Sequence, residues 1–112
     1  MAGTRDTMRH RKRMSLKFGI EAPTRVAFTE DFSSSGMCIK TAAVSPPGSR
    51  LKIELTLPDG NLVKIEAVVV WTKKVPPNMI NMIKKCGMGI EFTSFESGGL
   101  AFASLCDELH MR

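Results

Sequence analysis

Two short groups of residues in the first third of the chain have complementary binding chemistry, one cationic and one acidic. The first is a pair of arginines, Arg9 and Arg13, whose spacing places both side chains on one side of a helix or of an extended segment. The planar guanidinium group suits phosphate oxygens and the O6 and N7 edge of guanine. We therefore expect the pair to converge on one ligand. Arg5 and Arg9 have the same spacing, so the sequence leaves open which pair is used.

The second group is the stretch Asp-Phe-Ser-Ser-Ser-Gly at residues 31–36. The Asp31 carboxylate can accept hydrogen bonds from the N1 and N2 donors of guanine. The Ser33 hydroxyl lies on the same side of an extended chain, and Gly36 permits close approach of a backbone. The same residue types also form ordinary turns between strands. We expect a turn that presents a carboxylate and a hydroxyl.

The positive charge of the chain is confined to its N-terminal end. Residues 1–17 hold six basic residues and one acidic residue, whereas the other 10 basic and 10 acidic residues cancel, and the whole chain carries +5. An anionic partner is therefore expected at this end. We predict that residues 1–14 form a flexible basic arm and that residues 15–112 form the folded domain.

Alternating apolar residues predict that this domain is built mainly of β-strands. The clearest element is a long hairpin over residues 50–73, which turns at Pro58-Asp59-Gly60-Asn61. The expected strands lie at residues 16–20, 26–28, 37–41, 50–57, 62–73 and 87–92.

Helical spacing of apolar residues appears near the C-terminus. Residues 100–109 fit an amphipathic α-helix, and residues 76–85 fit one or two helical turns. The predicted fold class is mainly all-β: a small six-stranded antiparallel barrel with a C-terminal α-helix.

Residues suited to catalysis or to metal binding are sparse. His10 and His110 lie near opposite termini, there is no tyrosine, and no nucleophile motif or phosphate-binding glycine loop is present. The glycines at 87 and 89 fall in a strand, where glycine marks a bulge or the close approach of another group. We predict that the chain is not an enzyme and holds no metal.

The cysteines and the apolar runs indicate the compartment. Cys38, Cys86 and Cys106 are odd in number and match no CxxC spacing, so we expect neither a disulfide framework nor a zinc site. The longest apolar run, Ala67 to Trp71, is far shorter than the roughly 20 residues of a membrane span. The prediction is a cytoplasmic protein that is not inserted in a membrane.

Taken together, the order and spacing of these groups resemble the PilZ domain family. The resemblance rests on RxxxR at residues 9–13, DxSxxG at residues 31–36, a strand containing Val-Val-Trp at residues 69–71, and Gly-Met-Gly-Ile-Glu-Phe at residues 87–92. It extends over nearly the whole chain. It implies a six-stranded PilZ-type barrel and a bacterial receptor for cyclic di-GMP, bound as a ligand without any cofactor.

The resemblance also implies roles for particular residues. Arg9 and Arg13 would wrap over the phosphates and guanines of the ligand, while Asp31, Ser33 and Gly36 would read a guanine edge. A domain of this kind would signal by changing conformation and presenting a new surface to a partner protein.

Two alternatives remain open. One is a PilZ-like protein-interaction module without nucleotide binding, which would use an apolar surface around residues 79–83. The other is nonspecific nucleic-acid binding by the basic arm. The neutral remainder of the chain and the lack of aromatic residues in the arm make nucleic acid the less favoured partner.

Overall fold

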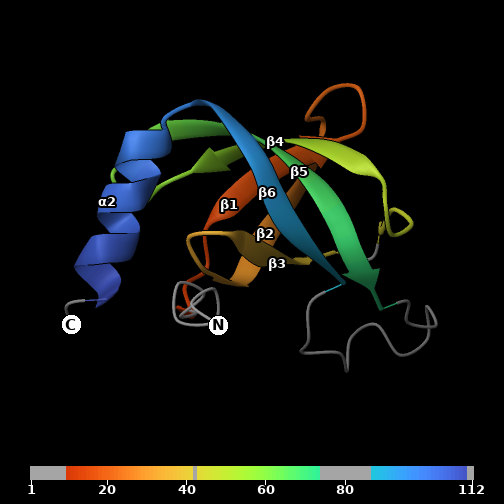
Figure 1. The fold of residues 1–112 in the computed structure, drawn as a ribbon, viewed down its shortest axis with the longest axis horizontal. Coiled ribbons are helices and arrows are strands. Elements are labelled where there is room, and N and C mark those ends of the chain that lie inside the picture. Colours follow the sequence, from red (N-terminus) through yellow and green to blue (C-terminus); the bar gives the residue numbers. More distant parts are fainter. Residues whose placement is uncertain (1–9, 42, 74–86, 111–112) are drawn as a thin grey trace.

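The chain folds into a barrel of six antiparallel strands with one helix at its C-terminal end (Figure 1). The computed structural model describes residues 10–41, 43–73 and 87–110. Its elements are β1 (Ser15–Gly19), β2 (Arg25–Phe32), β3 (Gly36–Lys40), β4 (Arg50–Thr56), β5 (Leu62–Thr72), β6 (Met88–Ser97) and α2 (Gly99–His110).

The barrel is closed in the order β1-β2-β3-β6-β5-β4. Closure comes from β1, which pairs with β2 on one side and with β4 on the other, so that Leu16 lies opposite both Ala27 and Leu55. The predicted six-stranded antiparallel barrel is confirmed.

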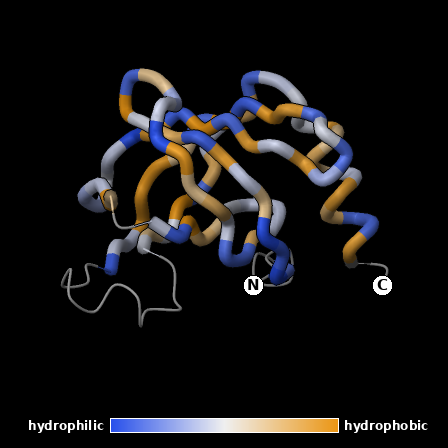
Figure 2. The backbone as a smooth tube through the Cα atoms, turned by 180° about the vertical axis from the view of Figure 1, so that it is seen from behind, coloured by the Kyte–Doolittle hydropathy of each residue, from blue (hydrophilic) through white to orange (hydrophobic). Residues whose placement is uncertain are grey.

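Alternation of side chains explains why these segments form strands around a common core. In β4, Leu51 and Ile53 are buried and Lys52 between them is exposed. Ala67 and Ile65 of β5 face them in register, as the predicted hairpin requires. Figure 2 shows the resulting alternation of hydrophobic and hydrophilic residues along the barrel strands.

Helix α2 covers one end of the barrel with its apolar side (Figure 1). Phe102 is 2% exposed, and its ring centroid lies 5.7, 5.5 and 5.7 Å from those of Phe32, Phe92 and Phe95. The aromatic cluster joins the ends of β2 and β6 to the helix, so the predicted C-terminal helix is confirmed with the barrel as its partner.

Two strands are longer than their sequence patterns indicate. β6 continues past Phe92 to Ser97. Every residue of this extension is exposed, so its sequence shows no apolar alternation. Backbone pairing with β5, such as Lys64 with Ser97, stabilises it. β2 takes in Asp31 and Phe32, which the sequence assigned to a turn. The helical turns predicted at residues 76–85 lie outside the described residues.

The cysteines correct one expectation. Cys38 is disulfide-bonded, so the prediction of no disulfide is wrong, and the cysteine pattern lends no support to a reducing compartment. Sequence spacing cannot show which cysteines the fold brings together. Cys106 is a free thiol facing the core, and burial, with a smaller effect of the Asp107 carboxylate, raises its pKa to about 11.

Neither a membrane span nor a metal cluster is found in the described part of the chain. No helix there has the length and apolar character to cross a membrane. No group of three or more histidine, cysteine, aspartate or glutamate side chains is arranged there to hold a metal ion.

Candidate ligand-binding site

The end of the basic arm lies along β2 and continues the pairing that β1 begins. His10 and Phe32 exchange two backbone hydrogen bonds of 2.8 and 3.0 Å, and the Thr29 N–H donates to the Met14 carbonyl oxygen at 2.9 Å. Residues 11–13 therefore run beside residues 30 and 31. The register thus brings the end of the arm to the start of the predicted ligand loop.

Arg13 is exposed and already has an aromatic partner. Its guanidinium carbon lies 4.0 Å from the centroid of the Phe28 ring, a cation–π geometry that restrains the side chain on the outside of β2. Arg5 and Arg9 lie outside the described residues, so the choice between the two arginine pairs stays open.

Positive charge surrounds a shallow hollow of about 540 Å³ beside this segment. Within it, the Glu30 carboxylate lies 3.7 Å from the Arg11 guanidinium and 4.0 Å from the Lys40 ammonium. Four cations and one carboxylate therefore face the same space, which favours an anionic occupant. The lining residues are Arg11, Lys12, Arg13, Phe28, Thr29, Glu30 and Lys40.

A β-bulge places two carboxylates in succession on β2. Thr29 pairs with Ile39, but Asp31 pairs with the next residue of β3, Cys38, which leaves Glu30 as the extra residue. Consequently Glu30 and Asp31 are both half-buried, whereas Thr29 is buried. Strict alternation would have turned one of these carboxylates into the core.

The loop that follows is held by its own serines. Ser33 is fully buried, and its hydroxyl accepts a hydrogen bond from the Ser35 N–H at 3.2 Å and lies 3.3 Å from the Ser35 hydroxyl. The Ser33 N–H donates to the Gly36 carbonyl oxygen at 2.8 Å, and the Phe92 N–H donates to the Ser35 carbonyl oxygen at 2.8 Å. These bonds make a rigid turn attached to β6.

Two glycines allow unusually close contacts beside this loop. A Cβ atom on Gly36 would lie 2.3 Å from the Ile90 carbonyl oxygen of β6. On Gly89 it would lie 2.2 Å from Nε1 of Trp71. The close approach that Gly36 was predicted to permit is thus made by β6. Gly89 pairs with Trp71 where β5 bulges at Val70, and it permits the kind of close contact that its position in a strand indicated.

Trp71 is the residue that the sequence analysis did not single out as a site residue. Its indole is 44% exposed and helps to line a hollow of about 410 Å³ that includes Ser35 and Gly36. Trp71 appeared in the sequence only as part of a strand pattern. The sequence offered one signal for this residue: Trp71 is a large aromatic residue near the end of β5, two positions after the buried Val69.

Comparison with known proteins decides the family. The sequence matches the family model of the PilZ domain over residues 4–101. The chain belongs to the PilZ domain family. The resemblance inferred from the residues is therefore confirmed, and PilZ domains are binding and regulatory modules.

A solved structure supports the PilZ fold independently. The inhibitor of motility MotI/DgrA of Bacillus subtilis superposes with a TM-score of 0.73 at 18% sequence identity. The match covers 94% of this chain and 50% of MotI/DgrA, so this chain spans about half the length of that protein. No curated protein matches the sequence.

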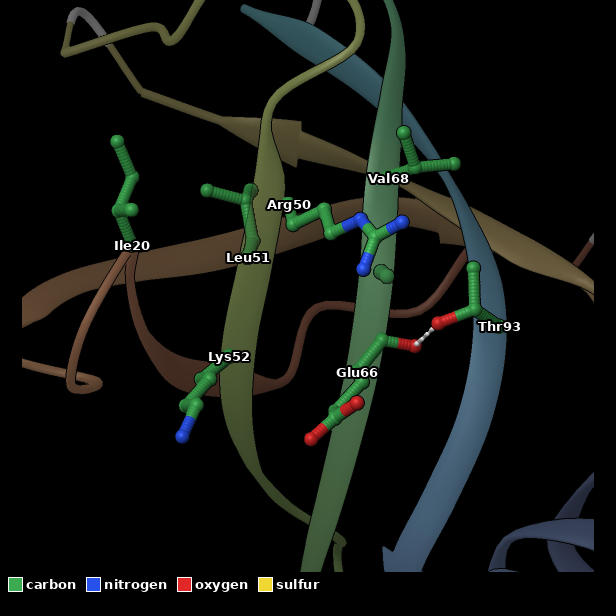
Figure 3. A pocket seen from close by; sticks show the side chains of 8 residues that line it. Ile20, Arg50, Leu51, Lys52, Glu66, Val68 and Thr93 are labelled. Atoms are coloured by element: carbon green, nitrogen blue, oxygen red, sulfur yellow. Dashed lines mark hydrogen bonds between the residues drawn. The ribbon is translucent and has the colours of Figure 1, made fainter.

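This PilZ domain has a larger hollow, of about 590 Å³, on the outer face of β4 and β5 (Figure 3). Arg50, Lys52 and Glu66 line it, and the Thr93 hydroxyl donates to the Glu66 carbonyl oxygen at 3.0 Å. Among the residues that the structure describes, none from either predicted motif lines this hollow. Size alone therefore does not make it the candidate site.

Proposed function

We propose that this PilZ domain is a bacterial receptor for cyclic di-GMP that signals to a partner protein through a conformational change. The observation that carries the proposal is the register of the arm, in which residues 11–13 run beside residues 30 and 31 of β2, so that Arg13 lies alongside the part of the strand that contains Asp31. The proposed compartment is the cytoplasm, where this second messenger would be met.

The charges beside β2 suit the two phosphates of the ligand. Arg11, Arg13 and Lys40 present cationic groups to one hollow, and the proposed Arg9 adds another from the arm. Charge-assisted hydrogen bonds of this kind contribute about 1.5 to 3 kcal/mol each. Two or three such bonds therefore suffice for a substantial part of a micromolar affinity.

The acidic loop suits a guanine edge. The Asp31 carboxylate would accept from the guanine N1 and N2 donors, which adenine lacks at these positions. We assign to the buried Ser33 hydroxyl the task of fixing the loop, and to Gly36 the close packing of β3 on β6. The exposed indole of Trp71 offers a flat surface on which a purine could stack.

Pairing of the arm with β2 reduces the entropic cost of binding. Fixing one flexible residue costs about 1 to 2 kcal/mol of backbone entropy. Residues 10–14 are held by hydrogen bonds to Thr29 and Phe32, so the ligand need not order them.

Titration calorimetry with cyclic di-GMP tests the proposal. The wild-type chain should bind saturably, with a dissociation constant in the micromolar range. Arg13→Ala and Asp31→Asn should each weaken binding by about tenfold or more, because each removes a charged hydrogen-bond partner. Thermal unfolding should change little, since Arg13 is exposed and Asp31 lies outside the buried core.

Two controls separate a specific site from general charge attraction. Arg25→Ala removes the same charge from an exposed residue at the other end of β2 and should leave binding intact. Cyclic di-AMP has the same phosphates and should bind weakly. A folded wild-type chain that ignores cyclic di-GMP at high micromolar concentration would overturn the proposal.

The same variants discriminate the nucleic-acid alternative. Binding to a single-stranded oligonucleotide through the basic arm would fall steeply with salt concentration and would be indifferent to Asp31→Asn. A specific guanine site requires that carboxylate. Oligonucleotide binding without cyclic di-GMP binding would favour the alternative.

A further inference from the structure

Thr29 is a buried polar residue in a row of apolar ones. It is 2% exposed, and its inward-facing neighbours along β2 are Ala27 and, beyond the bulge, Phe32. A buried hydroxyl is unfavourable unless it is hydrogen-bonded, because it loses its bonds to water. The partners of Thr29 therefore indicate why a hydroxyl is present here.

Both partners of the Thr29 hydroxyl belong to the arm. It donates to the Lys12 carbonyl oxygen at 2.6 Å and accepts from the Met14 N–H at 2.9 Å. The backbone N–H of Thr29 adds a third bond, to the Met14 carbonyl oxygen at 2.9 Å. One residue thus holds the chain on both sides of Arg13.

The pairing of the arm with β2 shows that the Thr29 hydroxyl bonds the arm where the backbone ladder is interrupted. His10 pairs with Phe32, and Met14 is bonded to Thr29, so three arm residues face two residues of β2. The extra residue interrupts the regular ladder of backbone bonds. The Thr29 side chain bonds Lys12 and Met14 at this interruption, where valine of similar shape could not.

We infer that Thr29 is a positioning residue whose hydroxyl holds the bulge at residues 11–13 and so presents Arg13 to an anionic ligand. It acts on the ligand only through the arm backbone. The effect of Thr29 on ligand affinity rests on the proposed function. The effect of Thr29 on the arm is independent of any ligand.

Limited digestion with trypsin, followed by mass spectrometry of the fragments, measures the arm directly. Trypsin cuts after Arg11, Lys12 and Arg13 only when this segment leaves β2. Thr29→Val removes the hydroxyl and keeps the shape, so cleavage there should accelerate about tenfold without nucleotide. Thr29→Ser restores the hydroxyl and should be cleaved at close to the wild-type rate.

Cleavage after Lys52 and Lys64 provides the internal control. Both residues lie within barrel strands, β4 and β5, and become accessible only when the barrel opens. In Thr29→Val the ratio of arm cleavage to barrel cleavage should rise. An unchanged ratio would overturn the inference, and general unfolding of this variant, which speeds both cleavages alike, would give that result. Arm cleavage of Thr29→Ser as fast as that of Thr29→Val would also overturn it.

Calorimetry on the same two variants connects the arm to binding. Thr29→Val should weaken cyclic di-GMP binding by about tenfold, and Thr29→Ser should bind like the wild type. Unchanged affinity in Thr29→Val would overturn the claim that the bulge presents Arg13. If the wild type does not bind cyclic di-GMP, the proposed function fails, and the cleavage ratio still decides whether Thr29 positions the arm.

Discussion

The guanidinium carbon of Arg13 lies 4.0 Å from the centroid of the Phe28 ring. This contact restrains a long, exposed side chain that the proposed function requires. Phe28→Leu keeps an apolar side chain but removes the aromatic face, a loss of about 0.5 to 1 kcal/mol at an exposed site. We expect the affinity for cyclic di-GMP, measured by calorimetry, to fall about two- to fivefold.

Phe28→Tyr is the matched control for this prediction, because tyrosine retains the ring and should retain the affinity. Tighter binding by Phe28→Leu would contradict the argument, since it would mean that Arg13 must leave the ring to reach the ligand.

Glu30 is positioned to compete with the proposed anionic ligand for the cations around it. Its carboxylate lies 3.7 Å from Arg11 and 4.0 Å from Lys40. Glu30→Gln removes the negative charge and should tighten cyclic di-GMP binding, by up to about fivefold, because exposed ion pairs of this kind are worth at most about 1 kcal/mol. Raising the salt concentration should shrink the difference between variant and wild type.

Glu54→Gln makes the same change of charge on β4, away from the arm, and should leave the affinity unaltered. Weaker binding by Glu30→Gln would show instead that Glu30 orients Arg11 for the ligand.

The two glycines beside the loop should differ in their tolerance of a methyl group. In Gly36→Ala the new Cβ meets the backbone of β6 at Ile90, which cannot move without breaking strand pairing. In Gly89→Ala it meets the Trp71 side chain, which is 44% exposed and can swing away. We expect Gly36→Ala to lower the free energy of unfolding by about 1 to 3 kcal/mol, and Gly89→Ala by less.

Urea denaturation measures both variants, and a second substitution sharpens the comparison. Adding Trp71→Ala should relieve the cost of Gly89→Ala and should not relieve that of Gly36→Ala. Equal costs in the two single variants would contradict the distinction between backbone and side-chain contacts.

The Cys106 thiol makes the stability of the barrel depend on alkaline pH. Burial, and then Asp107, raise its pKa in the folded chain from 9.0 to about 11. A group with a raised pKa stabilises the fold fully below its unfolded pKa, and this contribution is lost as the pH rises through the folded pKa. The free energy of unfolding should therefore fall between about pH 9 and pH 11.

Cys106→Ala has no thiol and should show a smaller decline over the same pH range in chemical denaturation curves. Parallel curves for the two proteins would show that other groups cause the alkaline loss of stability.

Strands with strictly alternating buried and exposed side chains could be predicted from the sequence. The hairpin of β4 and β5 follows from strict alternation, whose buried positions include Leu51 and Ile53. The far end of β6 could not be predicted, because its side chains are exposed and show no alternation, although Phe95 still packs on Phe102. The extension of β2 to Phe32 was hidden by turn-forming residues that follow directly.

The sequence indicated a chemistry for the candidate site but not the contacts that support it. Arginine and aspartate at the observed spacing indicated an anion and a guanine edge. Nothing in the sequence indicated that Ser33 is fully buried in its turn, or that Thr29 bonds the arm where three arm residues face two of β2. Such bulges arise from packing between distant segments and leave no local pattern.

Closure of the ring through β1 also determines how far the chain can be shortened from its N-terminus. Truncation before Ser15 removes arm residues and leaves all six strands paired, whereas truncation through Gly19 would uncover the pairing edges of both β2 and β4. Two bare edges invite association with other copies of the chain and aggregation. A shortened protein that begins at Met14 keeps this buried residue and is therefore the natural reference for measuring what residues 1–13 contribute.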